Sequence, residues 1–497
     1  MAVSSQTFIL TVFNVMNVIL GSGVLGMGYA MNSLGWLTFT LLLVAFYLLG
    51  IFVIQNLVYC CEIANIDSYE DMGFKTFGKP GKLYVVFCIF MQTFSAMVSF
   101  MYIVKSELPE VLATASQNLG NCPETQPWYV SGTTLYLLIL LLIVLPLASL
   151  KQIDFLSWTS TMAMIAMMIF TVIISCYSFI ITCPAVENEG GSHGNSSMNC
   201  KGFSEFTHEN TGSDWEAFTK GVEAQRAQNF LAQKGCPINA GPDFSSSSGS
   251  IKAILAVPIM VFAFMCQESI VPVYAQLMKD NGTGADMMRI AKTALSGILV
   301  LYWFIAFMAY RTWGSATISD MLLPYSYGYR SSWWILIARC CSIICVIFST
   351  PLLHYPCRRC LQMLFFGNYD FTWARHIGIM VILLSAVAIT VGTAKSLKQI
   401  FTYGGIISSG SLMIILPNLC YNFLTSPEQV EKFDLEKKNN DNQVQEQGET
   451  FIQNDTTNEA INEKRRNFSR ILGYVGIGFM ILCFILQLGQ DLKMIQV

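Results

Sequence analysis

Small and polar residues interrupt the first apolar segment of the chain. The stretch FNVMNVILGSGVLGMGYAM, residues 13–31, is apolar enough for lipid but holds Asn14, Asn17 and a Gly-Ser-Gly triplet at 21–23. Glycine lowers helix propensity, and unwound backbone at membrane depth survives only where it is buried in protein or lines a cavity. Unwinding here would aim the amides of the following half-helix at the break, where the positive dipole end suits a carboxylate. The freed carbonyls and an asparagine side chain suit a small cation; the alternative is a tight helix crossing through small residues.

The sixth apolar segment is interrupted as well. In LAVPIMVFAFMCQESIVPVY, residues 255–274, Pro258 and Pro272 flank a Cys-Gln-Glu centre at 266–268. Interrupted spans at corresponding positions of two halves are the best sequence indication of a transporter site. A carboxylate inside a span marks a functional site by default, so Glu268 is a candidate proton-coupling group, substrate contact or ion-pair partner. The alternative is a solvated position near a cytoplasmic water funnel.

The eighth apolar segment offers a third polar element. In SIICVIFSTPLLHYP, residues 342–356, Ser349 and Thr350 stand directly before Pro351. Proline disrupts the preceding helical turn, and helical spacing brings both hydroxyls to one face with the carbonyl of Val346. These oxygens are therefore candidate ion ligands, unless the hydroxyls bond back to carbonyls four residues earlier.

Composition indicates a polytopic membrane protein rather than a soluble enzyme. The 497 residues are 53% hydrophobic and 12% charged, with a mean hydropathy of +0.50, whereas a soluble domain carries about twice that charged fraction. The net charge of −3 gives no indication of a nucleic-acid partner. The sequence shows no Ser/His/Asp constellation, phosphate-binding loop or metal-ligand cluster, so no enzyme activity is expected.

Apolar windows of about 20 residues, the length needed to cross a bilayer, predict an all-α fold of eleven transmembrane helices. The predicted spans are 6–31, 35–60, 83–104, 133–150, 156–181, 251–276, 290–311, 332–356, 376–393, 399–422 and 470–490. Lysine and arginine in the loops place the N-terminus in the cytoplasm, and the odd number of spans then places the C-terminus outside.

Two polar segments lie between these spans. Residues 182–250 are predicted to face the outside, where N-glycosylation and a disulfide are chemically possible. The candidates are the acceptor Asn195 and the cysteine pair Cys183 and Cys200, and the partner of Cys236 stays open. Residues 425–469 lack aromatic and β-branched density, which predicts a disordered, acidic cytoplasmic linker.

Charged residues near the outer ends of two spans are further candidates. Lys105 and Glu107, at the end of the third span, are predicted to form an interface pair without a chemical role. Arg339 in the eighth span is a candidate functional residue, although arginine there can also extend its guanidinium to the membrane surface.

Several motifs together resemble one known family. These are the two interrupted segments with SYEDMGFKTFGKPGK (68–82), YIVKSELP (102–109) and STPLLHYPCRRCLQMLFF (349–366). They are similar to the sodium-coupled neutral amino acid transporters, solute carrier family 38, of the amino acid and auxin permease group. The resemblance runs in consistent order from the first span to the tenth.

The resemblance implies two inverted five-helix repeats, as in the bacterial leucine transporter, plus an eleventh helix. The implied organisation is a first repeat at 1–181, an extracellular loop at 182–250, a second repeat at 251–424, the linker at 425–469 and the last helix with its tail at 470–497. The protein is expected to be a monomer in the lipid bilayer of the plasma membrane, with an endosomal membrane as the alternative.

The resemblance also implies roles for individual residues. Asn17 falls on an asparagine linked to sodium and substrate. The expected substrate-binding residues are Asn17, Gly21, Ser22, Gly23, Phe262, Ala263 and Phe264, and the expected sodium-binding residues are Asn17, Leu20, Val346, Ser349 and Thr350. The chain departs from the family at 266–268, where Cys-Gln-Glu replaces the usual Cys-His-Pro.

The function implied is secondary active symport of a small neutral amino acid, glutamine-like, with Na⁺ as the co-transported ion. The departure at 266–268 keeps a proton-coupled carrier using Glu268 as an alternative. An amino-acid sensor without useful turnover, signalling through 425–469, is the alternative from another class.

Overall fold

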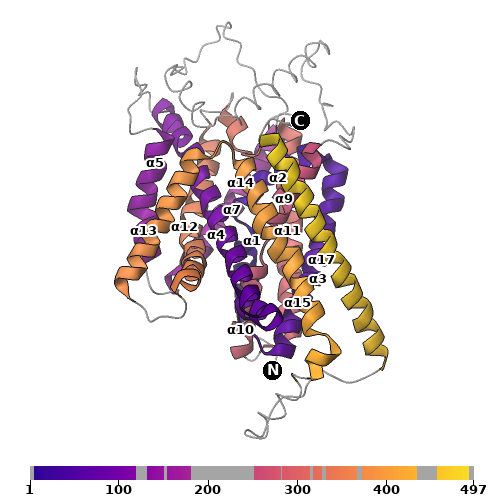
Figure 1. The fold of residues 1–497 in the computed structure, drawn as a ribbon. Coiled ribbons are helices and arrows are strands. Elements are labelled where there is room, and N and C mark those ends of the chain that lie inside the picture. Colours follow the sequence, from indigo (N-terminus) through magenta and orange to yellow (C-terminus); the bar gives the residue numbers. More distant parts are fainter. Residues whose placement is uncertain are drawn as a thin grey trace.

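The chain is a bundle of helices in the computed structural model (Figure 1). The structure describes residues 5–118, 131–149, 154–180, 251–280, 282–313, 317–326, 332–366, 372–431, 433 and 456–491, and within these ranges it contains no strand. The predicted glycosylation site Asn195, the cysteines Cys183 and Cys200, and the middle of the predicted linker lie outside the described residues, so those assignments stay predictions. The bounds 425–469 predicted for a disordered linker are wrong at both ends, because residues 427–431 are helical and the last helix begins at Thr456 rather than at 470.

A described helix lies at every predicted span, but several helices are longer than predicted, among them Tyr69–Asn118 against 83–104, Trp333–Phe366 against 332–356, and Thr456–Asp491 against 470–490. Ten described helices are long and apolar enough to cross a membrane, or up to eleven when α1 (Ser5–Ile19) and α2 (Gly23–Leu34), bent by 59° at their break, count as one span. The remaining elements are α3 (Trp36–Ala64), α4 (Tyr69–Asn118), α5 (Gly132–Ile139), η2 (Leu140–Val144), α6 (Leu145–Ser149), α7 (Asp154–Ile180), α9 (Ile251–Ala263), α10 (Gln267–Lys279), α11 (Gly284–Trp313), η4 (Leu323–Ser326), α12 (Trp333–Phe366), α13 (Trp373–Thr393), α14 (Leu397–Gly404), η5 (Gly405–Ser409), η6 (Ser411–Ile415), α15 (Leu416–Leu424) and α17 (Thr456–Asp491). The predicted all-α, eleven-span fold is confirmed at this level.

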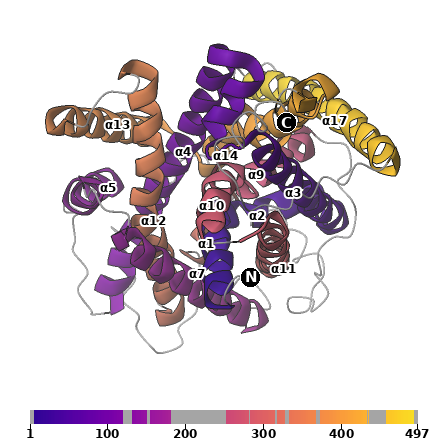
Figure 2. The same ribbon diagram turned by 90° about the horizontal axis from the view of Figure 1, so that it is seen from below.

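Both expected interruptions are present. The first span breaks between Ile19 and Gly23, and the sixth breaks between α9 and α10 at residues 264–266. Pro258 and Pro272 both lie inside helices, so the sixth break falls between the prolines rather than at either one. Seen from below, α1, α2 and α10 lie near the middle of the bundle, with α5 and α13 on one side and α17 on the other (Figure 2).

The last helix, α17, docks on the bundle through a polar contact on α3 and α15. The Asn56 amide donates to Asn418 Oδ1 at 3.1 Å and to Ser469 Oγ at 3.0 Å. Arg465 Nε in turn donates to Asn56 Oδ1 at 2.9 Å. A buried polar side chain is costly unless it is hydrogen-bonded, so these mutual bonds fix where α17 sits.

Near one end of the bundle, α4 and α12 share a buried charge cluster that we call the arginine cluster, made of Ser106, Glu107, Glu110, Asp320 and Arg339. Arg339 donates to Glu107 Oε2 at 2.7 Å and to the Leu322 carbonyl at 3.1 Å, and it lies 4.0 Å from Glu110. Asp320 accepts hydrogen bonds from Ser106 Oγ at 3.0 Å and from the Leu322 amide at 3.2 Å. Burial raises the pKa of the Asp320 carboxyl, although these two hydrogen bonds and the charge of Arg339 oppose the shift.

The prediction that Lys105 pairs with Glu107 is wrong. Glu107 pairs with Arg339, while Lys105 donates to the Val391 carbonyl at 3.2 Å. Residues two apart on a helix point in different directions, which explains why these neighbours in sequence face different partners. The cluster also ties the segment at 320–322 to both long helices.

Candidate functional site

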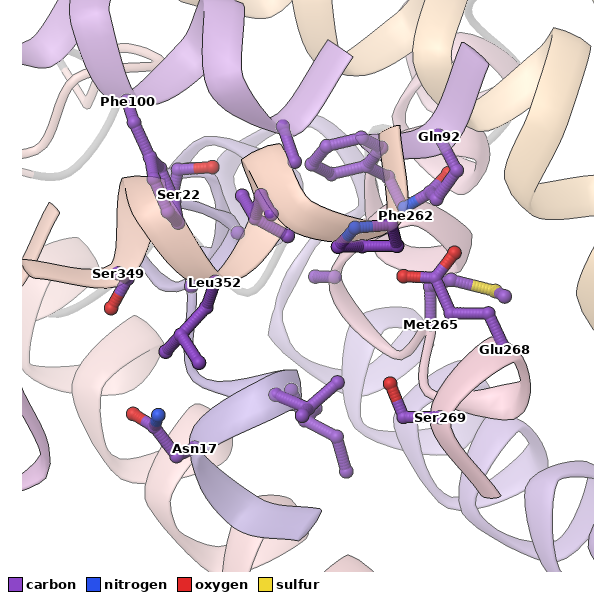
Figure 3. Close-up of a pocket in the computed structure, with 18 of the residues that line it drawn as sticks. Asn17, Ser22, Gln92, Phe100, Phe262, Met265, Glu268, Ser269, Ser349 and Leu352 are labelled. Atoms are coloured by element: carbon purple, nitrogen blue, oxygen red, sulfur yellow. The ribbon is translucent and has the colours of Figure 1, made fainter. Parts of the chain in front are cut away.

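The two broken spans meet at a cavity of about 340 Å³. Its lining includes Asn17, Gly21, Ser22 and Gly23 from the first span, Phe262, Ala263 and Glu268 from the sixth, Ser349 from α12, and Gln92 and Phe100 from α4. Figure 3 shows Asn17, Ser22 and Ser349 on one side of the cavity, and Gln92, Phe262, Met265 and Glu268 on the other. The fold therefore brings together the polar residues that the sequence placed on three separate segments.

The start of α2 presents an uncapped helix end to this cavity. Ser22 is the N-cap residue, but its side chain makes no capping hydrogen bond. Its hydroxyl instead lies 2.5 Å from the hydroxyl of Ser99 on α4. The first amides of a helix need acceptors, and together with the positive dipole end they form a ready anion site. A carboxylate in the cavity beside Ser22 and Gly23 would supply those acceptors.

Small residues in the first break also allow close packing. A Cβ added at Gly23 would lie 2.6 Å from the Ala263 Cβ, and one added at Gly21 would lie 3.3 Å from the Phe100 ring. Both explanations offered by the sequence thus hold, because the triplet unwinds the helix and also lets the two breaks touch. The close contact makes the two interruptions one structural unit.

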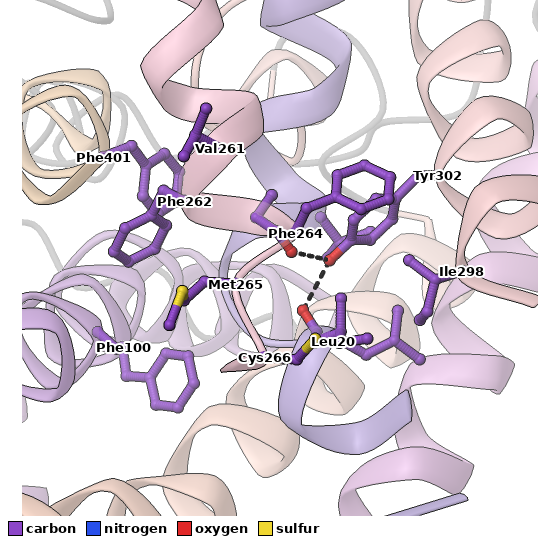
Figure 4. Close-up of a cluster of buried hydrophobic side chains, with 14 of the residues drawn as sticks. Leu20, Phe100, Val261, Phe262, Phe264, Met265, Cys266, Ile298, Tyr302 and Phe401 are labelled. Atoms are coloured by element: carbon purple, nitrogen blue, oxygen red, sulfur yellow. Dashed lines mark hydrogen bonds between the residues drawn. The ribbon is translucent and has the colours of Figure 1, made fainter. Parts of the chain in front are cut away.

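Tyr302 on α11 joins the two breaks. Its hydroxyl lies 2.7 Å from the carbonyl oxygen of Ile19, the last residue of α1, and 3.0 Å from that of Ala263, the last residue of α9 (Figure 4). The Tyr302 ring is buried and meets the Phe264 ring edge-on, with 5.4 Å between the ring centroids. Nothing in the local sequence marks this tyrosine, since it belongs to an ordinary apolar span.

Some expected site residues lie outside the cavity lining. Phe264 turns away and packs against Phe46 and Tyr302. Leu20, Val346 and Thr350 are buried but are not among the lining residues. The Thr350 hydroxyl donates to the Val346 carbonyl, four residues earlier, at 2.6 Å. Of the hydroxyls in the eighth span, Ser349 alone lines the cavity.

The opposite side of the cavity carries polar groups, on Gln92 and Glu268, with unused hydrogen-bonding capacity. Gln92 Oε1 accepts hydrogen bonds from Ser408 Oγ at 2.9 Å and Ser409 Oγ at 2.6 Å. Glu268 Oε2 is buried and has no hydrogen-bond partner among the described residues. Sequence reasoning singled out Glu268 but missed Gln92, whose signal was a polar side chain within the apolar window 83–104.

The described residues contain no group of three or more histidine, cysteine, aspartate or glutamate side chains arranged to hold a metal ion. A monovalent ion needs only neutral oxygens, and Asn17 and Ser349 present side-chain oxygens to one side of the cavity. That chemistry fits a hard alkali cation better than a transition metal.

The model of the family described as transmembrane amino acid transporter protein matches residues 4–205 and 230–440. The chain belongs to this transporter family. It also resembles sodium-coupled neutral amino acid symporter 2 of Danio rerio, with 32% identity over 424 residues, covering 85% of this chain and 77% of that protein. Human sodium-coupled neutral amino acid transporter 4 is 28% identical over 445 residues, covering 85% of this chain and 79% of its own.

These relatives confirm the family suggested by the sequence motifs, the sodium-coupled neutral amino acid transporters of solute carrier family 38. The chain is thus a membrane transporter and not an enzyme. Among solved structures, a mutant manganese transporter of Eremococcus coleocola aligns over 98% of this chain and 97% of its own, with 10% identity and a TM-score of 0.43.

Proposed function

We propose that this transporter is a sodium-coupled symporter of small neutral amino acids in the plasma membrane, with its N-terminus in the cytoplasm and its C-terminus outside. The observation that carries the proposal is the uncapped start of α2, which faces a cavity lined also by Asn17 and Ser349. The substrate carboxylate would accept hydrogen bonds from the α2 amides. Sodium would lie among the Asn17 side chain, the Ser349 hydroxyl and the carbonyls of the first break at Ile19, which lines the cavity, and Leu20. Val346 and Thr350 would stand behind Ser349.

Coupling follows from the shared break. Sodium and substrate each complete polar groups of the same unwound segment, so each would raise the affinity for the other by the same factor. With sodium and substrate bound, the unwound segment favours one arrangement of the helices. The helix bundle then rocks around the binding site, so that the cavity opens to the other side of the membrane.

The polar pair Gln92 and Glu268 supports a glutamine-like substrate. The two serine hydroxyls occupy Gln92 Oε1, which leaves the Gln92 amide N–H groups available as donors. A substrate carboxamide would accept from Gln92 through its oxygen and donate to the Glu268 carboxylate through its nitrogen. Side chains of that kind therefore match the donor and acceptor on this side of the cavity.

Uptake of radiolabelled glutamine, with sodium or with choline outside, tests the proposal. Asn17→Ala should raise the sodium concentration for half-maximal uptake by about 10-fold, the effect of losing roughly 1.4 kcal/mol of binding, with normal surface expression. Asn422→Ala is the matched control, because Asn422 on α15 bonds the Asn418 carbonyl and does not line the cavity. Sodium-stimulated uptake that is identical in both variants would refute the assignment of Asn17.

A second candidate is proton coupling through Glu268, favoured by the lack of a hydrogen-bond partner for Glu268 Oε2 among the described residues. A buried carboxylate in this position can take up a proton instead of a protein partner. Uptake that persists in choline, follows an imposed pH gradient and disappears in Glu268→Gln would favour this version over sodium coupling.

A further inference from the structure

We propose that Tyr302 is a positioning residue that links ion binding at the first break to amino acid binding at the sixth. The link is the Tyr302 hydroxyl group, which both breaks share. The identity of the two ligands, sodium and a neutral amino acid, rests on the proposed function. Tyr302 itself is not among the residues that line the cavity, so it acts through the backbone of Ile19 and Ala263, which do line it.

The geometry leaves the Tyr302 hydroxyl little freedom. The residue is fully buried, its ring is held against Phe264, and its oxygen lies within hydrogen-bonding distance of both Ile19 O and Ala263 O. These carbonyls end α1 and α9, so they belong to the negative dipole ends of two half-helices. A buried donor between two such ends holds them at a fixed separation.

A phenol carries one hydrogen, so the hydroxyl can donate fully to only one of the two carbonyls at a time. Ile19 O also accepts from the Gly21 amide at 2.8 Å. A cation bound near Ile19 O competes for the lone pairs of this oxygen and turns the Tyr302 hydrogen toward Ala263 O. Ion occupancy at the first break therefore tightens the end of α9 at the sixth break, and the reverse also holds because coupling is reciprocal.

Direct packing prevents the breaks from relaxing independently. A Cβ at Gly23 would lie 2.6 Å from the Ala263 Cβ and 2.8 Å from its Cα, so no side chain or water separates the segments there. A shift of Ala263 is thus felt at once by Gly23, which starts α2. The hydroxyl and this contact form a closed path between the two breaks.

Tyr302→Phe tests the proposal because it keeps the ring and removes only the hydroxyl. The measurement is the sodium concentration for half-maximal uptake in proteoliposomes, at low and at saturating amino acid, normalised to reconstituted protein. In the natural chain we expect saturating amino acid to lower that value at least about 5-fold. In Tyr302→Phe the factor should fall below about 2, because the two binding events no longer share a hydrogen bond.

Tyr136→Phe is the matched control. The Tyr136 hydroxyl donates to the Ala388 carbonyl at 3.0 Å, joining α5 to α13 away from the cavity. Tyr136→Phe should leave unchanged the factor by which saturating amino acid lowers the sodium concentration for half-maximal uptake, even if the variant lowers the yield of folded protein. A Tyr302→Phe protein that loses stability but keeps the natural factor would show a purely structural hydrogen bond and overturn the proposal.

A second variant covers the case in which Tyr302→Phe does not accumulate. Phe264→Leu keeps the hydroxyl but removes the aromatic edge that orients the Tyr302 ring, so the factor should fall between those of the natural chain and Tyr302→Phe. An unchanged factor in Phe264→Leu then overturns the proposal. If the natural chain ignores sodium, the proposed function fails instead, and the same factor is measured between the amino acid and an imposed proton gradient.

Discussion

The helices α4 and α12 each contribute to two polar regions, the arginine cluster and the cavity, which differ in the partners of their buried carboxylates. In the arginine cluster, Glu107 of α4 pairs with Arg339 of α12 at 2.7 Å. About 15 Å further along α12, at 1.5 Å per residue, Ser349 faces a cavity in which Glu268 Oε2 has no protein partner among the described residues. The buried carboxylates thus face an arginine in one region, whereas at the cavity Glu268 Oε2 is open to a ligand.

This difference separates structural from functional polarity within one membrane protein. A buried ion pair gains little over apolar packing, but breaking it exposes a large desolvation cost. A buried polar group without a partner already carries the desolvation cost in the ligand-free protein. A ligand that forms a hydrogen bond with this group therefore gains binding free energy without a further desolvation cost for the group. The comparison therefore predicts large stability losses in the cluster, and large functional effects at the cavity with small or opposite stability effects.

The largest effect is expected for Arg339→Met. The change leaves Glu107 and Glu110 buried without their shared cation, and removing one partner of a buried pair costs about 3–5 kcal/mol. Thermal unfolding of purified protein in detergent measures the loss. Arg311→Met is the control, because Arg311 is exposed and stacks on Phe179, a contact worth about 1 kcal/mol or less. Equal melting temperatures for the two variants would mean that the cluster contributes no stability.

Gly23→Ala should have a smaller effect on stability and a strong effect on uptake. The new methyl group would overlap Ala263, and overpacking costs about 1–3 kcal/mol while it forces the two breaks apart. Gly378→Ala on α13 is the matched control, since a Cβ there meets nothing within 4 Å and alanine favours a helix by about 0.5–1 kcal/mol over glycine. The comparison needs unfolding and uptake measured on both variants. Normal uptake in Gly23→Ala would mean that contact between the breaks is not required.

The sequence predicted the parts of this site that carry their own local signal. Glycine in an apolar run indicated the first break, and a polar centre between two prolines indicated the second. The prolines did not fix the exact position of the second break, because a proline can remain within a membrane helix when neighbouring groups satisfy the freed carbonyl. Spacing alone could not decide which hydroxyl of the eighth span faces the cavity.

The contacts that join separate spans could not be predicted in the same way. Tyr302 and Gln92 look like ordinary residues of apolar spans, and their importance depends on partners up to 317 positions distant in sequence. Arg339 and Glu107 were both visible as charges, but their pairing across 232 positions was not. Tertiary packing decides such pairs, and periodicity within one helix carries no information about it.

The smallest effect on stability, and the sharpest contrast with the arginine cluster, is expected for Glu268→Gln. Because Glu268 Oε2 lacks a protein partner among the described residues, replacing the carboxylate removes a desolvation cost and should raise the stability of the substrate-free protein by about 1 kcal/mol. The measurement is thermal unfolding without substrate, beside Glu463→Gln, an exposed glutamate on α17 that does not line the cavity. The same variant should take up glutamine less well than alanine, since alanine has no side-chain nitrogen to bind there. A drop in melting temperature as large as that of Arg339→Met would instead place Glu268 in a structural network like the arginine cluster, and the distinction between the two regions would be lost.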